Sequence, residues 1–435
     1  MPPRNLTIIA LVALASLLCY HRAMRNPYAS VLDEALTEIE SRYVDRVESR
    51  ELFEGAMEGM VGKLDPYSQY ISPEDYNRFR ESLDQEFGGI GIEVTEDPQS
   101  KRLTVFSPLP GTPAFEKGMR AGDTILKIDG KDTQGLKVTD AVHLLRGKAG
   151  TPVTLTVIHK GQEQPIDVEM ERAKIQVESV LGDLRRPDGR WEFGLAEQPK
   201  IALVRLVNFG EHTEEELEKA LAQVDGKCDA LILDLRDNPG GLLPVAIAVC
   251  DMFLDTGPIV STRGRDGKIQ RQWDASDGVL FDSKKPMVIL VNHFSASASE
   301  IVAACLQDHA RAIVMGQRSW GKGTVQNLIP LEGGKSRLKL TTAGYWRPSG
   351  KNIHRRRGDS DTAEWGVMPH PGYELIVADE EMKKVYRQRR ERDVYRAEKD
   401  PPGKPTTADP PKVEDPQLRK AIEFLKEKLT IPMKG

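Results

Sequence analysis

The chain has 435 residues, a length that accommodates about three domains of ordinary size. Hydrophobic residues make up 39% and charged residues 29% of it, which is typical of a soluble globular protein with a sizeable core. The formal net charge of −5 gives no reason to expect nucleic acid as a partner, and the short basic run at 355–357 indicates a solvated loop.

An apolar run, LTIIALVALASLLCY, occupies residues 6–20 and has Arg4 before it and Arg22 and Arg25 after it. The run is shorter than the roughly 20 residues that a membrane-spanning helix needs, and it is typical of a signal-peptide core. Basic residues on both flanks leave its orientation open. We expect residues 1–25 to be a signal peptide or a membrane anchor, and the chain to be exported to the periplasm or cell envelope.

The next segment shows helical periodicity. Apolar residues repeat at helical spacing over 32–43 and again over 53–64, until Asp65-Pro66 ends the second helix. Residues 30–85 are therefore predicted to form a helical N-terminal region.

From Phe87 the pattern changes to short alternating strands, seen in IGIEVTE, RLTVFS, TILKIDG, PVTLTVIH and PIDVEME. One helix, VTDAVHLLR, interrupts them, and a glycine-rich loop, FGGIG, leads into the first strand. We predict a β-rich module at 86–172 of the size of a small binding domain.

Residues 173–378 are predicted to form an α/β layer. Buried strands alternate with helices in the order IALVRLV, EEELEKALAQV, ALILDL, LLPVAIAVCDMFL, MVILVN, EIVAACLQD and AIVMG. The tail at 379–435 begins with a charged helix, continues through a Pro-rich linker, DPPGKPTTADPP, and ends in an amphipathic helix at 417–429.

The cysteines and histidines do not predict a metal site. Cys228, Cys250 and Cys305 lie in apolar strand or helix patterns, so buried free thiols are expected, and removal of a leader containing Cys19 would leave an odd number. The eight histidines form no H-E-x-x-H or comparable cluster. We expect neither a metal nor an organic cofactor.

The stretch FSASASE at 294–300 has two interpretations. Ser297 and Glu300 form S-x-x-E, so Ser297 could simply cap the helix that follows. Alternatively, the strand-to-helix turn exposes the Ser297 hydroxyl at a helix N-terminus, and the N–H of Ala298 faces a developing oxyanion. The segment alone leaves both open.

A second candidate is GQRSWGKGTVQ at 316–326, which matches the start of a phosphate-binding loop, G-x-x-x-x-G-K. Gly323 stands where that loop needs Ser or Thr, and a strand follows where it needs a helix, so we reject nucleotide binding. Lys322 between two glycines indicates a lysine threaded into a packed site, where desolvation favours the neutral amine as a general base. Gln326, four residues on in the expected strand, would share its face and orient the amine.

A third candidate is DLRDNPGG at 234–241, a turn between an apolar strand and an apolar helix. Its glycines could present unhindered N–H groups as half of an oxyanion hole, or serve only as a turn. A Ser-His arrangement is the rival chemistry. His293 on a strand end should point away from Ser297, and His309 lies at the far end of the following helix.

Together these motifs resemble the C-terminal processing peptidases, or tail-specific proteases, over about residues 30–375. LDPYSQYISPEDY at 64–76, FGGIGIEV, DLRDNPGG, SASASE and GKGTVQ occur in that family's order. The resemblance implies Ser297 as nucleophile, Lys322 as general base and Gln326 as its support. It carries the oxyanion donors onto the N–H groups of Ala298 and of a glycine in NPGG, for which we prefer Gly241 to Gly240.

The resemblance also implies that the β-rich module is a PDZ domain. Gly88, Gly89, Ile90 and Gly91 would receive the C-terminal carboxylate of a substrate on backbone amides, and Arg146 would link the domain to the protease core. One departure is the charged insertion HRRRGDSDTAEW at 354–365, between the family's YWRPSG and GVMP segments, which leaves the substrate groove or its regulation open.

The fold class expected is therefore a multidomain α/β (α+β) protein. It combines the helical N-terminal region, the PDZ-like domain, a serine-protease core of the ClpP/crotonase-like type and the helical tail. The expected function is a serine endopeptidase that binds substrate C-termini and cleaves with a Ser–Lys dyad. The alternative is a catalytically silent PDZ-based peptide-binding scaffold. Expected partners are proteins or peptides with exposed C-termini, and the resemblance admits a homodimer, an adaptor or membrane association.

Overall fold

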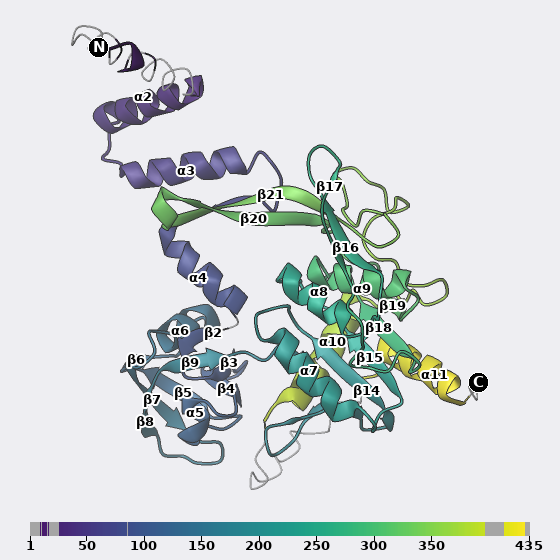
Figure 1. The fold of residues 1–435 in the computed structure, drawn as a ribbon. Helices are drawn as coiled ribbons and strands as arrows, with labels where there is room; N and C mark the ends of the chain where they lie inside the picture. Colours follow the sequence, from purple (N-terminus) through teal and green to yellow (C-terminus); the bar gives the residue numbers. More distant parts are fainter. Residues whose placement is uncertain are drawn as a thin grey trace. The chain divides into compact units, whose positions relative to one another are not determined.

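The computed structural model describes residues 26–84, 86–395 and 413–430, together with residue 9, residues 11–14 and residue 16 (Figure 1). The predicted leader lies mostly, and the Pro-rich linker entirely, outside these residues. Within the described residues, no helix is both long and apolar enough to cross a bilayer. The chain divides into two compact units: Met1–Tyr76 with Gln326–Thr341, and Asn77–Val325 with Thr342–Gly435.

The first unit contains the predicted N-terminal helices, α2 (Pro27–Arg42) and α3 (Ser49–Val61), and the start of α4 (Pro73–Asp84). Strand β1 (Gln69–Ile71) pairs antiparallel with part of β21 (Ser336–Trp346), which follows β20 (Thr324–Leu331) and the short 3₁₀ turn η1 (Glu332–Gly334).

The β-rich module is an antiparallel sheet with strand order β3-β4-β5-β7-β8, on which β6 pairs with β5 and a separate pair is formed by β2 and β9. Apolar side chains alternate along its strands, so one face builds a core with helix α6. Its elements are β2 (Glu86–Gly89), β3 (Ile92–Glu96), β4 (Leu103–Pro108), α5 (Pro113–Glu116), β5 (Thr124–Ile128), β6 (Lys131–Asp132), α6 (Val138–Leu145), β7 (Pro152–Ile158), β8 (Ile166–Glu171) and β9 (Ala173–Gln176).

The α/β layer is built on a sheet with strand order β10-β14-β15-β18-β19, in which β14, β15, β18 and β19 run parallel. Its elements are β10 (Val180–Leu181), β11 (Leu184–Arg185), β12 (Trp191–Glu192), β13 (Gly194–Leu195), β14 (Gln198–Leu206), α7 (Thr213–Val224), β15 (Ala230–Asp234), α8 (Leu243–Asp251), β18 (Met287–Val291), α9 (Ala298–Asp308) and β19 (Ile313–Gly316).

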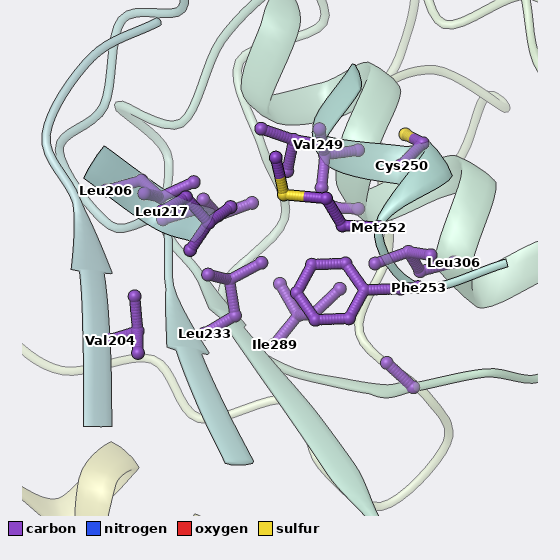
Figure 2. Packing of buried hydrophobic residues seen from close by; sticks show 14 of the residues in the cluster. Val204, Leu206, Leu217, Leu233, Val249, Cys250, Met252, Phe253, Ile289 and Leu306 are labelled. Atoms are coloured by element: carbon purple, nitrogen blue, oxygen red, sulfur yellow. The ribbon is translucent and has the colours of Figure 1, made fainter. Parts of the chain in front are cut away.

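Both faces of this sheet are covered, which explains why its strands are continuously apolar. Leu233 and Ile289 face the cluster formed with α7, α8 and α9, where Phe253 packs (Figure 2). Alternate residues such as Ile232 and Leu290 face the terminal helix α11 (Pro416–Thr430) on the other side. The predicted mixed fold class is confirmed. The predicted buried free thiols Cys228, Cys250 and Cys305 are confirmed as well.

The sequence patterns did not predict the hairpin of β16 (Pro258–Arg263) and β17 (Ile269–Asp274), which pairs with the end of β21. Strand β17 has mostly exposed polar side chains, so it lacks the apolar alternation that marks a strand.

A buried ion network joins the end of β15 to the tail. Arg236 binds Asp234 beside it and Asp415 at the start of α11, and Arg389 of α10 (Asp379–Asp393) also binds Asp234. Burial opposes ionisation of Asp415, but Arg236 and Arg389 outweigh it and lower the pKa of this carboxyl. The charged helix is thus packed onto the core beside the turn that carries Gly241.

Candidate active site

The three sequence segments singled out above meet at the carboxyl ends of β15 and β18. Parallel strands end at one edge of a sheet, so the turns that follow them lie close together. Asn238 joins the two turns, because its main-chain oxygen accepts bonds from Ala296 N at 3.0 Å and Ser299 Oγ at 2.9 Å. The DNPGG turn is thereby fixed against the SASAS turn.

The three serines have different environments. Ser295 is fully buried, donates to Leu235 O at 2.8 Å and accepts from Asn292 N at 2.9 Å. Ser299 is also fully buried and bound to Asn238. Ser297 is 8% exposed. Ser295 and Ser299 therefore stabilise the turn, while Ser297 is the serine of the three that solvent can reach.

The backbone of Ser297 has φ 56° and ψ −114°, a conformation that residues with a side chain rarely adopt. An ordinary N-cap residue has an extended conformation, so capping alone does not explain this geometry. Non-glycine residues in such regions cost about 1–3 kcal/mol each and concentrate at active sites. The strained turn presents this serine at the N-terminus of α9.

The two predicted oxyanion donors are unpaired within the described part of the chain. Ala298 N–H is in the first turn of α9 and has no acceptor there, and Gly241 N–H has none either. By contrast, Gly240 N–H donates to Asn238 Oδ1 at 2.8 Å. Gly240 packs so closely that an added Cβ would lie 2.8 Å from Ser297 Cβ. The geometry therefore favours Gly241 over Gly240 as the second donor.

Glu300 is the residue whose role sequence analysis missed. Its buried carboxylate accepts from Ser297 N at 2.8 Å and Lys322 N at 2.8 Å on Oε2, and from Gly321 N and Ser319 Oγ at 2.6 Å on Oε1. Only the bond to Ser297 belongs to the expected capping box. The same side chain therefore joins the turn of the proposed nucleophile to the loop of the proposed base.

Burial raises the pKa of Glu300, although the four hydrogen bonds act in the opposite direction. These four donors stabilise the buried carboxylate. Such an arrangement is costly to disturb, since each donor would be left buried and unpaired.

Lys322 lies in an irregular loop between Gly321, which has φ +87°, and Gly323. An added Cβ would lie 2.8 Å from Arg355 Cβ at Gly321, and 2.3 Å from His354 N at Gly323. The segment 353–355 therefore packs against both glycines. This close packing explains the two glycines, whereas Lys322 itself is only partly buried.

The predicted site residue Gln326 belongs to the first compact unit, Met1–Tyr76 with Gln326–Thr341, where its Nε2 donates to Thr341 Oγ1 at 3.1 Å. The argument that placed it on one strand face with Lys322 was wrong, because β20 begins only at Thr324. Its support of the lysine stays a prediction from the resemblance.

Neither histidine proposed for a rival Ser-His arrangement bonds Ser297. His293 Nδ1 contacts Gln317 Oε1 at 3.2 Å, and its ring packs on Phe294. His309 Nε2 contacts Pro258 O at 2.8 Å. Within the part of the chain that the structure describes, no group of His, Cys, Asp or Glu side chains is arranged to hold a metal.

The β-rich module has a groove of about 220 Å³ between β3 and α6. Its lining includes Gly89, Ile90, Gly91 and Arg146, whose guanidinium lies 4.2 Å from the centre of the Phe87 ring. The N–H groups of Ile90 and Gly91 donate to no described residue, so they are free to donate hydrogen bonds to an anionic ligand.

Gly88 differs from the other predicted carboxylate-binding residues. It lies in the β2–β9 pair, and an added Cβ there would meet Gly147 O at 2.0 Å. Gly88 does not line the groove. A glycine is needed there because the backbone of Gly147 packs directly against it. The link from Arg146 to the protease core stays a prediction.

Three family models match the chain. They are peptidase family S41 at residues 200–369, PDZ domain at 88–170, and the activating protease CtpB N-terminal domain at 23–75. The first includes every predicted residue of the dyad and oxyanion hole, and the second includes the predicted carboxylate loop.

Curated relatives span most of the chain. A carboxy-terminal-processing protease of Bartonella bacilliformis is 39% identical over 401 residues, covering 90% of this chain and 87% of that protein. The carboxy-terminal processing protease CtpA of Bacillus subtilis is 34% identical over 75% of this chain and 66% of its own length. Among solved structures, a photosystem II D1 C-terminal processing protease is 27% identical, covers 81% of this chain and 94% of that chain, and has a TM-score of 0.44.

Proposed function

Since this chain belongs to the peptidase S41 family and is a carboxy-terminal processing serine protease with a PDZ domain, we propose that Ser297 is its nucleophile and Lys322 its general base. The observation that carries this assignment is the shared acceptor. Ser297 N and Lys322 N both lie 2.8 Å from Glu300 Oε2, which brings the two backbones within the length of a lysine side chain.

In the acylation half of the reaction, Ser297 Oγ attacks the scissile carbonyl carbon while neutral Lys322 Nζ takes the hydroxyl proton. The carbonyl oxygen becomes an oxyanion that the N–H groups of Ala298 and Gly241 stabilise. Loss of one such donor costs about 10²–10³ in rate. Lys322 then gives its proton to the leaving amine as the C–N bond breaks, leaving an acyl-enzyme.

In the second half, Lys322 takes a proton from water, and the resulting hydroxide attacks the Ser297 ester. The same two N–H groups stabilise the second oxyanion. The Ser297–acyl bond breaks, the proton returns to Ser297 Oγ, and the new carboxyl end of the product is released. Gln326 supports the lysine in this scheme.

The groove of the PDZ domain selects the substrate. The unpaired N–H groups of Ile90 and Gly91 bind the terminal carboxylate, and Arg146 adds positive charge at the same groove. The apolar lining of Ile92, Val142 and similar residues favours a nonpolar last side chain. Substrates are therefore proteins with an exposed, unstructured and apolar C-terminus.

We also propose that the protein is exported to the periplasm or cell envelope. There it would form a homodimer or associate with an adaptor or the membrane. The apolar run at 6–20 supports export. Fractionation of cells that produce the full chain tests the compartment. Light scattering of the purified protein tests the dimer, and recovery of a monomer at working concentrations contradicts it.

The catalytic assignment is tested on a protein substrate with an apolar C-terminal tail, with cleavage followed by mass spectrometry. Ser297→Ala and Lys322→Ala should each abolish cleavage, whereas His293→Ala serves as the matched control and should cleave normally. Loss of activity in His293→Ala with Lys322→Ala still active favours a Ser-His mechanism instead. Amidation of the substrate's C-terminus should raise KM without lowering kcat if the PDZ groove binds the carboxylate.

A further inference from the structure

None of the residues of the charged insertion at 354–365 takes part in the proposed reaction. Its two ends meet, because Gly366 N donates to Ile353 O at 2.7 Å, so it forms a closed loop of the Ω type. Such loops are packed by their own side chains and frequently functional. We call residues 354–365 the insertion loop.

The insertion loop contacts the segment that carries Lys322 from both ends. At its start, Arg355 N donates to Gly321 O at 2.8 Å. At its end, Trp365 lies over Gly321, where an added Cβ would be 3.0 Å from Trp365 Cε3. A side chain at position 321, next to Lys322, would therefore collide with Arg355 and Trp365 of the insertion loop.

Two guanidinium groups lie close to the Trp365 ring. The guanidinium carbon of Arg318 lies 3.5 Å from the centre of the Trp365 ring, and that of Arg355 lies 4.2 Å from it. Both distances are within the range of a cation–π contact. Arg318 also donates to three main-chain oxygens of the insertion loop, those of Asp361, Ala363 and Trp365. Trp365 is only 8% exposed as a result.

The contact continues to the Glu300 carboxylate. The chain after Trp365 pairs with Ser319, which donates its N–H to Val367 O at 3.1 Å and accepts from Val367 N at 2.7 Å through Oγ. The same Oγ donates to Glu300 at 2.6 Å. Arg318, Ser319 and Gly321, all just before Lys322, are thus fixed by the insertion loop or by the residues that follow it.

Two arginines on one ring repel each other, and burial together with Arg355 lowers the pKa of Arg318. Asp361 pairs with Arg355 and acts in the opposite direction on Arg318. The three carbonyl bonds offset the repulsion and give Arg318 one fixed position, which is what a segment carrying a general base requires.

We propose that the insertion loop braces the segment 318–323 and that Trp365 is a positioning residue for Lys322. The proposal rests on the assignment of Lys322 as the general base. The proposal predicts an effect on the chemical step rather than on substrate binding. The reason is that the insertion loop contacts the backbone of the segment that carries Lys322 and does not line the peptide-binding groove.

The test measures kcat, KM and the single-turnover cleavage rate of Trp365→Ala, Trp365→Phe and a control. The control is Trp273→Ala, which removes a half-buried tryptophan stacked on Arg271 at 4.7 Å in the β16–β17 hairpin. Trp365→Ala should lower kcat and the single-turnover rate by about 10- to 100-fold, since a misplacement of 1 Å can cost that much. KM should stay within about threefold, Trp365→Phe should restore most of the rate, and Trp273→Ala should lower Tm with normal turnover.

The proposal is overturned if Trp365→Ala keeps wild-type kcat, or if its KM rises while kcat is unchanged, which would make the loop part of the substrate groove. Measuring Lys322→Ala in parallel distinguishes a failure of Lys322 as general base from a failure of Trp365 as its positioning residue. If Lys322→Ala cleaves normally, the proposed base is wrong, whereas an inactive Lys322→Ala beside a fully active Trp365→Ala refutes only the brace. Should Trp365→Ala not fold, Arg355→Ala removes one stacking cation from a half-exposed position. It should lower kcat by about threefold or more, and unchanged kcat there counts against the brace.

Discussion

Replacing Glu300 with glutamine tests the central hydrogen-bond network of the site. The change keeps the size of the side chain but turns one accepting oxygen into an NH₂ donor. If the NH₂ faces Ser297 N and Lys322 N, two N–H groups lose their acceptor. If it faces Ser319 and Gly321, the Ser319 hydroxyl can turn to accept, and only Gly321 N is left unpaired.

The second orientation is therefore preferred, and the cost follows from one buried N–H without an acceptor, about 1–3 kcal/mol. Removal of the buried charge offsets part of this, since burial raises the pKa of Glu300. We expect the free energy of unfolding to fall by about 1–2 kcal/mol and kcat to fall by about 100-fold, because the Lys322 loop shifts.

The assay is urea unfolding followed by circular dichroism, together with steady-state cleavage of the same substrate. Glu215→Gln is the matched control, because it makes the same change at an exposed ion pair with Lys219 and should alter neither quantity. If Glu300→Gln unfolds and turns over like the wild type, the carboxylate does not hold the two loops together.

Two further predictions concern the surroundings of the site. Asp415→Asn should destabilise the protein at pH 7 by about 3 kcal/mol, since Arg236 and Arg389 lose a buried partner. The depressed pKa of Asp415 means that its contribution is complete above its ordinary value of 3.8 and is lost as the pH falls below it. The variant should therefore lose less stability than the wild type between pH 5 and about pH 2 in urea unfolding, and parallel curves contradict this. Gly240→Ala should abolish cleavage because the new Cβ would meet the Ser297 turn, whereas Gly278→Ala, at a similar φ of +102° with open space around it, should cost about 1 kcal/mol and leave cleavage intact. Equal losses of activity in the two variants would show that strain, and not the collision, matters.

The sequence predicted the architecture well wherever apolar periodicity was strong. The strands around Leu233 and Ile289 are continuously apolar because both faces of the sheet are covered. Ser297 and Lys322 could be singled out because small residues surround each of them, and close backbone packing requires such residues.

What the sequence could not indicate depends on contacts between distant segments. The S-x-x-E pattern accounts for the bond from Glu300 to Ser297, but its bonds to Gly321 and Lys322 come from a loop more than twenty residues on. Nothing local marks a carboxylate that accepts from two segments. The strand-face argument for Gln326 failed for a similar reason, since the glycines beside Lys322 delay the start of the strand.

The backbone of Ser297 has a consequence for how this position can vary. Its conformation is one that glycine adopts freely, so a change to glycine would relieve strain of about 1–3 kcal/mol and make the folded protein more stable. Selection for folding and selection for activity therefore act in opposite directions on this residue. A chain of this kind that has lost its substrate should drift first toward a small, hydroxyl-free residue here. The strained backbone of Ser297 therefore identifies a position where stability and the proposed chemistry favour different residues.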